Sequence, residues 1–204
     1  SPGADQIIAS NSIGLMALAT SVGAEARILP IARDNAASIG TALGLAHDAD
    51  LIVTIGGASA GDHDLVGQVA AEHGLKQSFY KIAMRPGKPL MAGKLGDAIL
   101  LGLPGNPVSS MVCGYVFMLP LLRAMLGLAA QAAPRSGAVL ASALAANGAR
   151  EHYMRAAVSH GQIVAFDRQD SALLSVLSGA NALLVRPPND PARVIGDGVK
   201  FIPL

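Results

Sequence analysis

Leu51-Ile52-Val53-Thr54-Ile55 is an apolar, largely β-branched run that leads into the loop Gly56-Gly57-Ala58-Ser59-Ala60-Gly61-Asp62-His63-Asp64. An apolar run without alternation is typical of a strand buried on both faces, as in a parallel sheet. Glycines let a backbone approach a ligand closely, and loop N–H groups ahead of a helix favour anions. The two aspartates cannot bind an anion directly, but they can hold a divalent metal beside a phosphate-like group. The stretch therefore indicates a buried strand that ends in a functional loop.

Size and composition permit one large domain or two modest ones with a sizeable core, since the 204 residues are 51% hydrophobic and 14% charged. The net charge of +1, the 3% of aromatic residues and the lack of Trp argue against nucleic-acid binding. The single Cys113 lies in an apolar stretch, where we expect a buried small hydrophobe. One cysteine forms no disulfide framework, which is compatible with a cytoplasmic location.

An uncharged stretch from Ala98 to Leu122 is long enough by count to span a membrane. Pro104-Gly105-Asn106-Pro107 interrupts it, and Pro120 interrupts it again. Because these residues break regular backbone hydrogen bonding, we expect a strand, a turn and a buried helix, and no membrane span.

The first part of the chain alternates predicted helices and strands. Asn11 and Ser12 can cap the first helix. The predicted helices are Asn11–Val22, Ala36–His47, Asp64–His73 and Val108–Leu126, and the predicted strands are Ala26–Ile31, Leu51–Ile55, Gln77–Met84, Leu90–Ala92 and Ala98–Leu103. This alternation predicts an α/β domain, an open and mostly parallel sheet with flanking helices and one antiparallel hairpin.

The pattern changes after a linker at Ala129–Arg135. Short alternating segments follow, separated by turn residues: Val139–Ala145, His152–Ser159, Gln162–Phe166, Ala182–Arg186 and Val194–Ile202, with one helical turn near Ser171–Leu177. Such spacing predicts a small all-β barrel or sandwich. We therefore divide the chain into an α/β domain, residues 1–130, and a small β domain, residues 131–204.

Three loops begin where predicted strands end: Arg33-Asp34-Asn35, Gly56–Asp64 and Pro104–Ser109. Ligands of open α/β sheets bind outside the carboxyl ends of the strands, so these loops are the candidate site. Lys88, held between Pro86-Gly87 and Pro89, can add a fixed positive charge. Each feature also has a structural interpretation that stays open: Gly56-Gly57 as a tight turn, Asp62 and Asp64 as helix N-caps, and Asp34 as a turn residue.

Together these motifs resemble a known family. The segments Gly56–Asp64, Arg85-Pro86-Gly87-Lys88-Pro89 and Gly102-Leu103-Pro104-Gly105-Asn106-Pro107-Val108-Ser109 are similar, in order and spacing, to the MoeA-type molybdopterin molybdenumtransferases, which include the E domain of gephyrin. Asp5–Ser12, Arg150–Arg155 and Ser171–Ser175 extend the resemblance over nearly the whole chain. It implies a molybdopterin-binding, MogA-like domain followed by the family's C-terminal β domain.

The resemblance also implies a reaction: insertion of molybdenum from molybdate into adenylylated molybdopterin (molybdopterin-AMP), with Mg²⁺ assistance and release of AMP. The implied catalytic positions are Asp34, Asp64, Pro104 and Pro107, with Asp34 and Asp64 as metal ligands. The implied positions for binding the substrate are Gly56, Gly57, Ser59, Gly61, Asp62, Lys81, Lys88, Gly105, Asn106, Ser109, Ser171 and Ser175.

Family members also suggest a homodimer in the full-length protein and contacts with molybdopterin adenylyltransferase or molybdoenzyme chaperones. The family's Thr-Gly-Asp-Glu strand and two earlier domains are expected ahead of Ser1, so we expect the α/β domain to lack its first strand and the chain alone to hold part of the site. Two alternatives stay open: a molybdopterin adenylyltransferase, and a non-catalytic molybdopterin-binding or scaffolding module.

Overall fold

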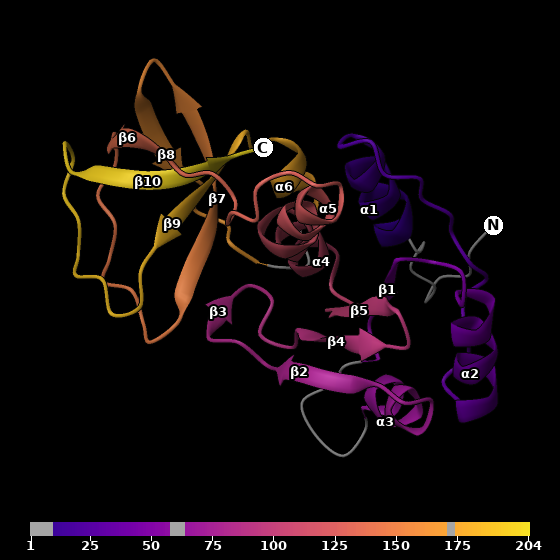
Figure 1. The fold of residues 1–204 in the computed structure, drawn as a ribbon. Helices are drawn as coiled ribbons and strands as arrows, with labels where there is room; N and C mark the ends of the chain where they lie inside the picture. The colour runs from indigo at the N-terminus through magenta and orange to yellow at the C-terminus, as the bar shows by residue number, and fades with distance from the viewer. Residues whose placement is uncertain (1–9, 58–63, 171–173) are drawn as a thin grey trace.

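The computed structural model describes residues 10–57, 64–170 and 174–204. Figure 1 shows an α/β part, with helices on both faces of a sheet, beside a β-barrel that contains the C-terminus. The predicted class, an α/β domain followed by a small β domain, is confirmed. The exact division at residue 130 stays a prediction.

The sheet of the α/β part has four described strands in the order β1 (Leu51–Ile55), β5 (Ala98–Leu103), β4 (Met91–Leu95) and β2 (Lys76–Tyr80). The pair β1–β5 is parallel, whereas β5–β4 and β4–β2 are antiparallel. In its described strands the sheet is thus mixed, because the chain returns to β5 through the predicted hairpin. The register pairs Ile55 with Leu103, so β1 and β5 end side by side.

Helices cover both faces of this sheet, and β5 contributes to both cores. Leu101 and Leu103 pack toward α1 (Asn11–Thr20) and the long helix that follows β5. Leu100 packs on the other face, toward α2 (Ala36–Leu45) and α3 (Leu65–Glu72). Successive side chains of a strand point to opposite faces, which explains why this strand is apolar at nearly every position.

A continuous helix from Pro107 to Met125 consists of α4 (Pro107–Cys113), the π-helical segment η1 (Gly114–Met118) and α5 (Leu119–Met125). The predicted helix Val108–Leu126 is confirmed. In the described part of the chain it is the one helix long and apolar enough to cross a membrane by length and composition. Its inner side chains belong to the core, where Val112, Cys113 and Met118 are almost completely buried.

The predicted strand Ala26–Ile31 is wrong, because the structure forms no strand there. The segment is held by its side chains: Arg27 pairs with Asp48 and donates a hydrogen bond to the carbonyl of Leu45 (2.9 Å). A strand is defined by its ladder partner. Among the described residues none pairs with this segment, although its sequence has strand character.

The C-terminal part is a closed barrel of β6 (Ser136–Leu140), β7 (Glu151–Ser159), β8 (Gln162–Ala165), β9 (Ala182–Arg186) and β10 (Gly198–Pro203), with the short helix α6 (Leu174–Ser178). The order β7-β8-β6-β10-β9 is closed by the pairing of β7 with β9. A short strand from the first part, β3 (Met84–Arg85), runs parallel to β7 and pairs Arg85 with His152.

The predicted strand Gln77–Met84 therefore divides into β2 and β3, which belong to different sheets. The break follows Lys81, whose φ of 66° is left-handed. That conformation interrupts an extended strand.

Candidate functional site

The loops after β1 and β5 meet at the end of the sheet, as the sequence predicted. The N–H of Gly56 donates a hydrogen bond to the carbonyl of Leu103 (2.9 Å). A Cβ atom added to Gly56 would lie 3.5 Å from the Cα of Gly105, and the φ of Gly56 is +80°. The left-handed conformation favours glycine at position 56, whereas the added Cβ would make only an ordinary van der Waals contact with the facing loop.

Gly105-Asn106-Pro107 opens the long helix. Asn106 is the N-cap and accepts a hydrogen bond from the N–H of Ser109 (3.4 Å), while Pro107 occupies the first turn and Pro104 is buried before it. Ser109 is itself buried. Asn11 does not cap its own helix as predicted; its Nδ2 donates instead to the carbonyl of Gly105 (2.8 Å). The first helix therefore fixes this loop.

Asp34 lines the same groove as Gly56, Gly57, Asn106 and Pro107. The neighbouring Asn35 caps α2 by accepting from the N–H of Ser38 (2.9 Å). Because Asn35 satisfies the helix end, the exposed carboxylate of Asp34 has no capping role and is available to a ligand.

The sequence left open whether Asp64 is a helix N-cap or a site residue, and its position in the structure is compatible with both. It caps α3, since its Oδ1 accepts from the N–H of Gly67 (2.9 Å). Burial, then the charge of Asp64 and a hydrogen bond to its carboxylate, raise the pKa of Tyr80. The Nζ of Lys81 lies 4.7 Å from the centre of the Tyr80 ring. Tyr80 therefore connects two predicted site residues, and its place directly before Lys81 was the signal available in the sequence.

The turn that carries Lys88 is pressed against the long helix. Gly87 has a φ of +108°, and a Cβ atom there would lie 2.5 Å from the Sγ of Cys113. Lys88 is exposed at this fixed turn. The Cys113 thiol is buried as predicted, and burial raises its pKa to about 12, so it packs as an apolar group.

Four predicted residues lie outside the described residues: Ser59, Gly61, Asp62 and Ser171. Ser175 lies exposed on α6, and its carbonyl accepts a hydrogen bond from the hydroxyl of Ser178 (2.8 Å). Their predicted roles stay predictions.

A group of basic side chains at the junction with the barrel escaped the sequence analysis. Arg155 is fully buried, and its Nη2 donates to the carbonyl of Asp170 (3.0 Å). Its Nε and Nη1, and the Nε2 of His152, are buried atoms without a hydrogen-bond partner among the described residues. Arg85 stands beside His152 through the β3–β7 pairing. We call Arg85, His152 and Arg155 the junction cluster.

The electrostatics of the junction cluster favour an anion. Burial, and then the positive charges of Arg85, Arg155, Arg186 and Arg150, lower the pKa of His152 to about 4. An unpaired buried guanidinium is unfavourable unless something supplies the missing acceptors. The one signal in the sequence was a charged residue inside the otherwise apolar run Met154–Val158.

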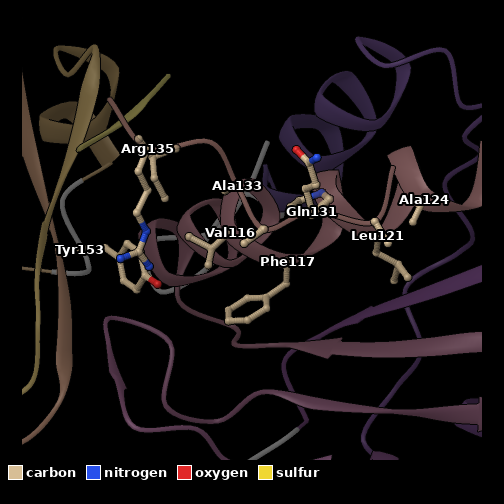
Figure 2. A pocket seen from close by; sticks show the side chains of 12 residues that line it. Val116, Phe117, Leu121, Ala124, Gln131, Ala133, Arg135 and Tyr153 are labelled. Carbon is tan, nitrogen blue, oxygen red and sulfur yellow. The ribbon is translucent and has the colours of Figure 1, made fainter. Parts of the chain in front are cut away.

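A second pocket of about 510 Å³ lies between the long helix, the linker and the barrel. Figure 2 shows Val116, Phe117 and Leu121 along its wall, with Arg135 and Tyr153 at one end. Arg135 forms an ion pair with Glu151 (2.9 Å), and the Tyr153 hydroxyl donates to the same carboxylate. Arg135, Tyr153 and Glu151 thus satisfy one another, so the charged groups at this end of the pocket are already paired.

The donor set for a metal is sparse among the described residues, where no three His, Cys, Asp or Glu side chains gather. Mg²⁺ is commonly held by one or two carboxylates together with substrate phosphates and water. Among the described residues Asp34 lines the groove beside Gly56, whereas Asp64, which caps α3 near Tyr80, is not part of that lining. The role of these two carboxylates as joint metal ligands stays a prediction.

Comparisons with protein families match both parts of the chain. Residues 3–124 match a family described as "Probable molybdopterin binding domain", and residues 137–204 match the "MoeA C-terminal region (domain IV)". Molybdopterin molybdenumtransferase 2 of Mycobacterium tuberculosis is 36% identical over 192 residues, which cover 89% of this chain and 47% of the relative. The molybdopterin molybdenumtransferase of Nostoc is 39% identical over 128 residues, which cover 61% of this chain and 29% of the relative.

Solved structures share the fold. The molybdopterin biosynthesis MoeA protein of Pyrococcus horikoshii superposes with a TM-score of 0.81 at 22% identity, over 100% of this chain and 51% of that protein. A molybdenum cofactor biosynthesis protein of Pyrococcus furiosus gives a TM-score of 0.78 at 22% identity, over 97% of this chain and 65% of that protein. The chain spans about half the length, or less, of the curated relatives described above.

Proposed function

The chain belongs to the molybdopterin-binding domain family, joined here to the MoeA C-terminal region, and on that premise we propose that it forms part of a molybdopterin molybdenumtransferase. The proposed reaction inserts molybdenum from molybdate into adenylylated molybdopterin and releases AMP. The names of the curated relatives support this reaction class over the adenylyltransferase alternative.

The observation that carries the proposal is the meeting of two glycine-containing loops where the parallel strands β1 and β5 end. Gly56 and Gly105 bring two backbones together, and Asp34 and Asn106 line the same groove. A phosphate-bearing, extended ligand suits such a strand-end site, because backbone N–H groups there bind anions without the bulk of side chains.

The junction cluster offers a second anion site within the same chain. Within the part of the chain that the structure describes, two N–H-bearing atoms of the buried Arg155 and one ring nitrogen of His152 have no hydrogen-bond partner. A tetrahedral oxyanion such as molybdate supplies the acceptors that a buried guanidinium lacks. We assign molybdate to this cluster and the phosphate link of the larger substrate to the strand-end loops.

Asp34 and Asp64 would hold Mg²⁺ together with the phosphates of the substrate. A bound Mg²⁺ supplies charge neutralisation for the phosphate link that is broken. Asp64 is oriented by the N–H of Gly67 and by Tyr80, and Asn106 and Pro107 fix the facing loop. These residues bind and orient, which is the contribution that a transferase of two anionic substrates requires. A homodimer and a cytoplasmic location are part of the same proposal.

Calorimetry on the full-length protein tests the proposal. We expect AMP to bind in the presence of Mg²⁺ and to bind more weakly when Asp34 and Asp64 are both changed to Asn. We expect molybdate to bind independently of those two substitutions. If the intact protein binds neither compound, the scaffolding alternative is favoured and the proposed function is wrong.

A further inference from the structure

Two side-chain amides bind the backbone of β7 in the way that a neighbouring strand would. The Oε1 of Gln169 accepts from the N–H of Arg155 (3.0 Å), and its Nε2 donates to the carbonyls of Arg155 (2.9 Å) and Phe166 (2.7 Å). Further along the strand, the Oδ1 of Asn181 accepts from the N–H of Val158 (2.8 Å), and its Nδ2 donates to the carbonyl of Val158 (3.0 Å). Each amide thus supplies the donor and the acceptor that one residue of a paired strand would supply.

Gln169 belongs to a loop that encloses Arg155 from two sides. The ladder between β7 and β8 ends at Ala156, and the N–H of Phe166 adds one more hydrogen bond, to the carbonyl of Arg155 (3.0 Å). The carbonyl of Asp170 accepts from the Nη2 of the same arginine (3.0 Å). Residues 166–170 therefore bind both the main chain and the guanidinium of Arg155.

The surroundings of Arg155 offer little else to hold its charged group. Alternation along β7 places Arg155 on the same face as Tyr153, and its cross-strand neighbour is Leu183. Both neighbours belong to an apolar core. Arg155 is fully buried, and its Nε and Nη1 have no hydrogen-bond partner among the described residues. The position of the guanidinium therefore depends on the loop and on the main chain from which the side chain extends.

The other buried arginine of the barrel is held differently. Arg186 forms an ion pair with the carboxylate of Asp190, so a protein anion fixes its guanidinium directly. Among the described residues Arg155 has no such carboxylate within ion-pair distance. An arginine that must leave donors free for a ligand cannot be fixed by a strong partner at those same donors, so it has to be fixed elsewhere.

We propose that Gln169 is a positioning residue of the junction cluster: by binding the N–H and the carbonyl of Arg155, it holds the guanidinium where an oxyanion is bound. The inference rests on the proposed function, in which this cluster binds molybdate. A guanidinium that is fixed in advance loses less conformational freedom when the anion binds, so the clamp contributes to affinity without a contact between Gln169 and the anion. The clamp of Asn181 on Val158 serves the strand alone.

Calorimetry with molybdate on the full-length protein tests the proposal. Gln169→Met nearly keeps the shape of the side chain and removes its donor and its acceptor, and Asn181→Leu is the matched control with the same loss at Val158. Gln169→Met should weaken molybdate binding at least about tenfold, and Asn181→Leu by less than about twofold. Urea unfolding checks that both variants are folded. A wild-type affinity in folded Gln169→Met overturns the proposal.

A double-mutant cycle tests whether Gln169 acts through Arg155. In the background of Arg155→Met, the further change Gln169→Met should alter molybdate affinity by less than about twofold, because the group that it positions is already gone. A further loss of about tenfold in that background overturns the proposal, since Gln169 would then affect the anion by another route.

Nuclear magnetic resonance provides an arm that needs no molybdate. With arginine labelled by ¹⁵N, the Nε–H signal of Arg155 is the one absent from Arg155→Met. This signal should shift or broaden in Gln169→Met and stay in place in Asn181→Leu. If the wild type binds no molybdate, the proposed function loses its molybdate site, and the signal still decides the role of Gln169: an unchanged signal overturns it. If Gln169→Met does not fold, Gln169→Asn, one methylene too short to reach both backbone groups, is measured with the same expected results.

Discussion

The strand-end loops and the junction cluster, which we propose as two anion sites, differ in exposure and in the groups that they present. The loops around Gly56 and Gly105 are open, and they carry backbone amides with carboxylates nearby. In the junction cluster His152 and Arg155 are buried and Arg85 is exposed, and the cluster presents side-chain N–H groups. An exposed site with carboxylates needs a metal to bind an anion, whereas a buried guanidinium binds one directly. This difference supports the proposal that molybdate and the phosphate-bearing substrate have separate sites.

The largest expected effect is the loss of turnover in Asp64→Asn. Asparagine is as good an N-cap as aspartate, so α3 should stay folded while the proposed metal ligand is lost. Losing several kcal/mol of charge stabilisation should slow molybdenum insertion on the order of 10³-fold. Steady-state rates of the full-length variant, with circular dichroism as the folding control, measure this. A wild-type rate removes Asp64 from the mechanism.

Arg155 and Arg186 are two buried arginines of the barrel that can be compared directly. Arg186 is as buried as Arg155, but it is paired with Asp190, which also binds Arg193 (2.6 Å). Arg186→Met leaves a buried carboxylate short of a partner and should destabilise the protein by about 3 kcal/mol. Urea unfolding measures that loss. Molybdate affinity should be unchanged, and a large change in affinity would show that Arg186 also serves the anion.

Arg155→Met should produce the reverse pattern. Among the described residues the guanidinium makes one hydrogen bond, to the carbonyl of Asp170, so removing it should lower the free energy of unfolding by no more than about 1 kcal/mol. Charge-assisted hydrogen bonds to an oxyanion contribute about 1.5–3 kcal/mol, so molybdate affinity should fall roughly 10- to 100-fold. Calorimetry measures the molybdate affinity of the variant. A large loss of stability with intact affinity would make Arg155 a structural residue.

The contrast between the two sites also explains which features could be predicted from the sequence. Local patterns predicted the helices, β1 and β5, because periodicity and caps depend on neighbouring residues. They also predicted that Gly56 and Gly105 lie at one edge of the sheet. The junction cluster depends on the pairing of β3 with β7, which joins residues far apart in the chain and has no local signal. The prediction of a strand at Ala26–Ile31 was wrong for a related reason, because strand character in the sequence does not supply a neighbouring strand to pair with.

The smallest expected effect is a pH dependence from His152. Its folded pKa of about 4 is below the ordinary value of 6.5, because burial and the nearby arginines disfavour the charged ring. The unfolded chain therefore binds a proton below pH 6.5 that the folded chain does not bind, and stability falls as the pH drops from about 6.5 to 4. The loss is on the order of 2 kcal/mol.

His152→Gln is the control, because glutamine does not titrate. Unfolding measured by urea between pH 4 and 7 should show a shallower pH dependence in this variant than in the wild type. Identical pH profiles would mean that the ring is charged or solvated in the folded protein.

The most direct measurement follows molybdenum and AMP together in one reaction. The full-length protein is given adenylylated molybdopterin, molybdate and Mg²⁺, and elemental analysis of the product is compared with the AMP released. One molybdenum atom inserted for each AMP, with both lost in Asp64→Asn, is the predicted result. Formation of adenylylated molybdopterin from molybdopterin and Mg-ATP, with no molybdenum ever inserted, would contradict it.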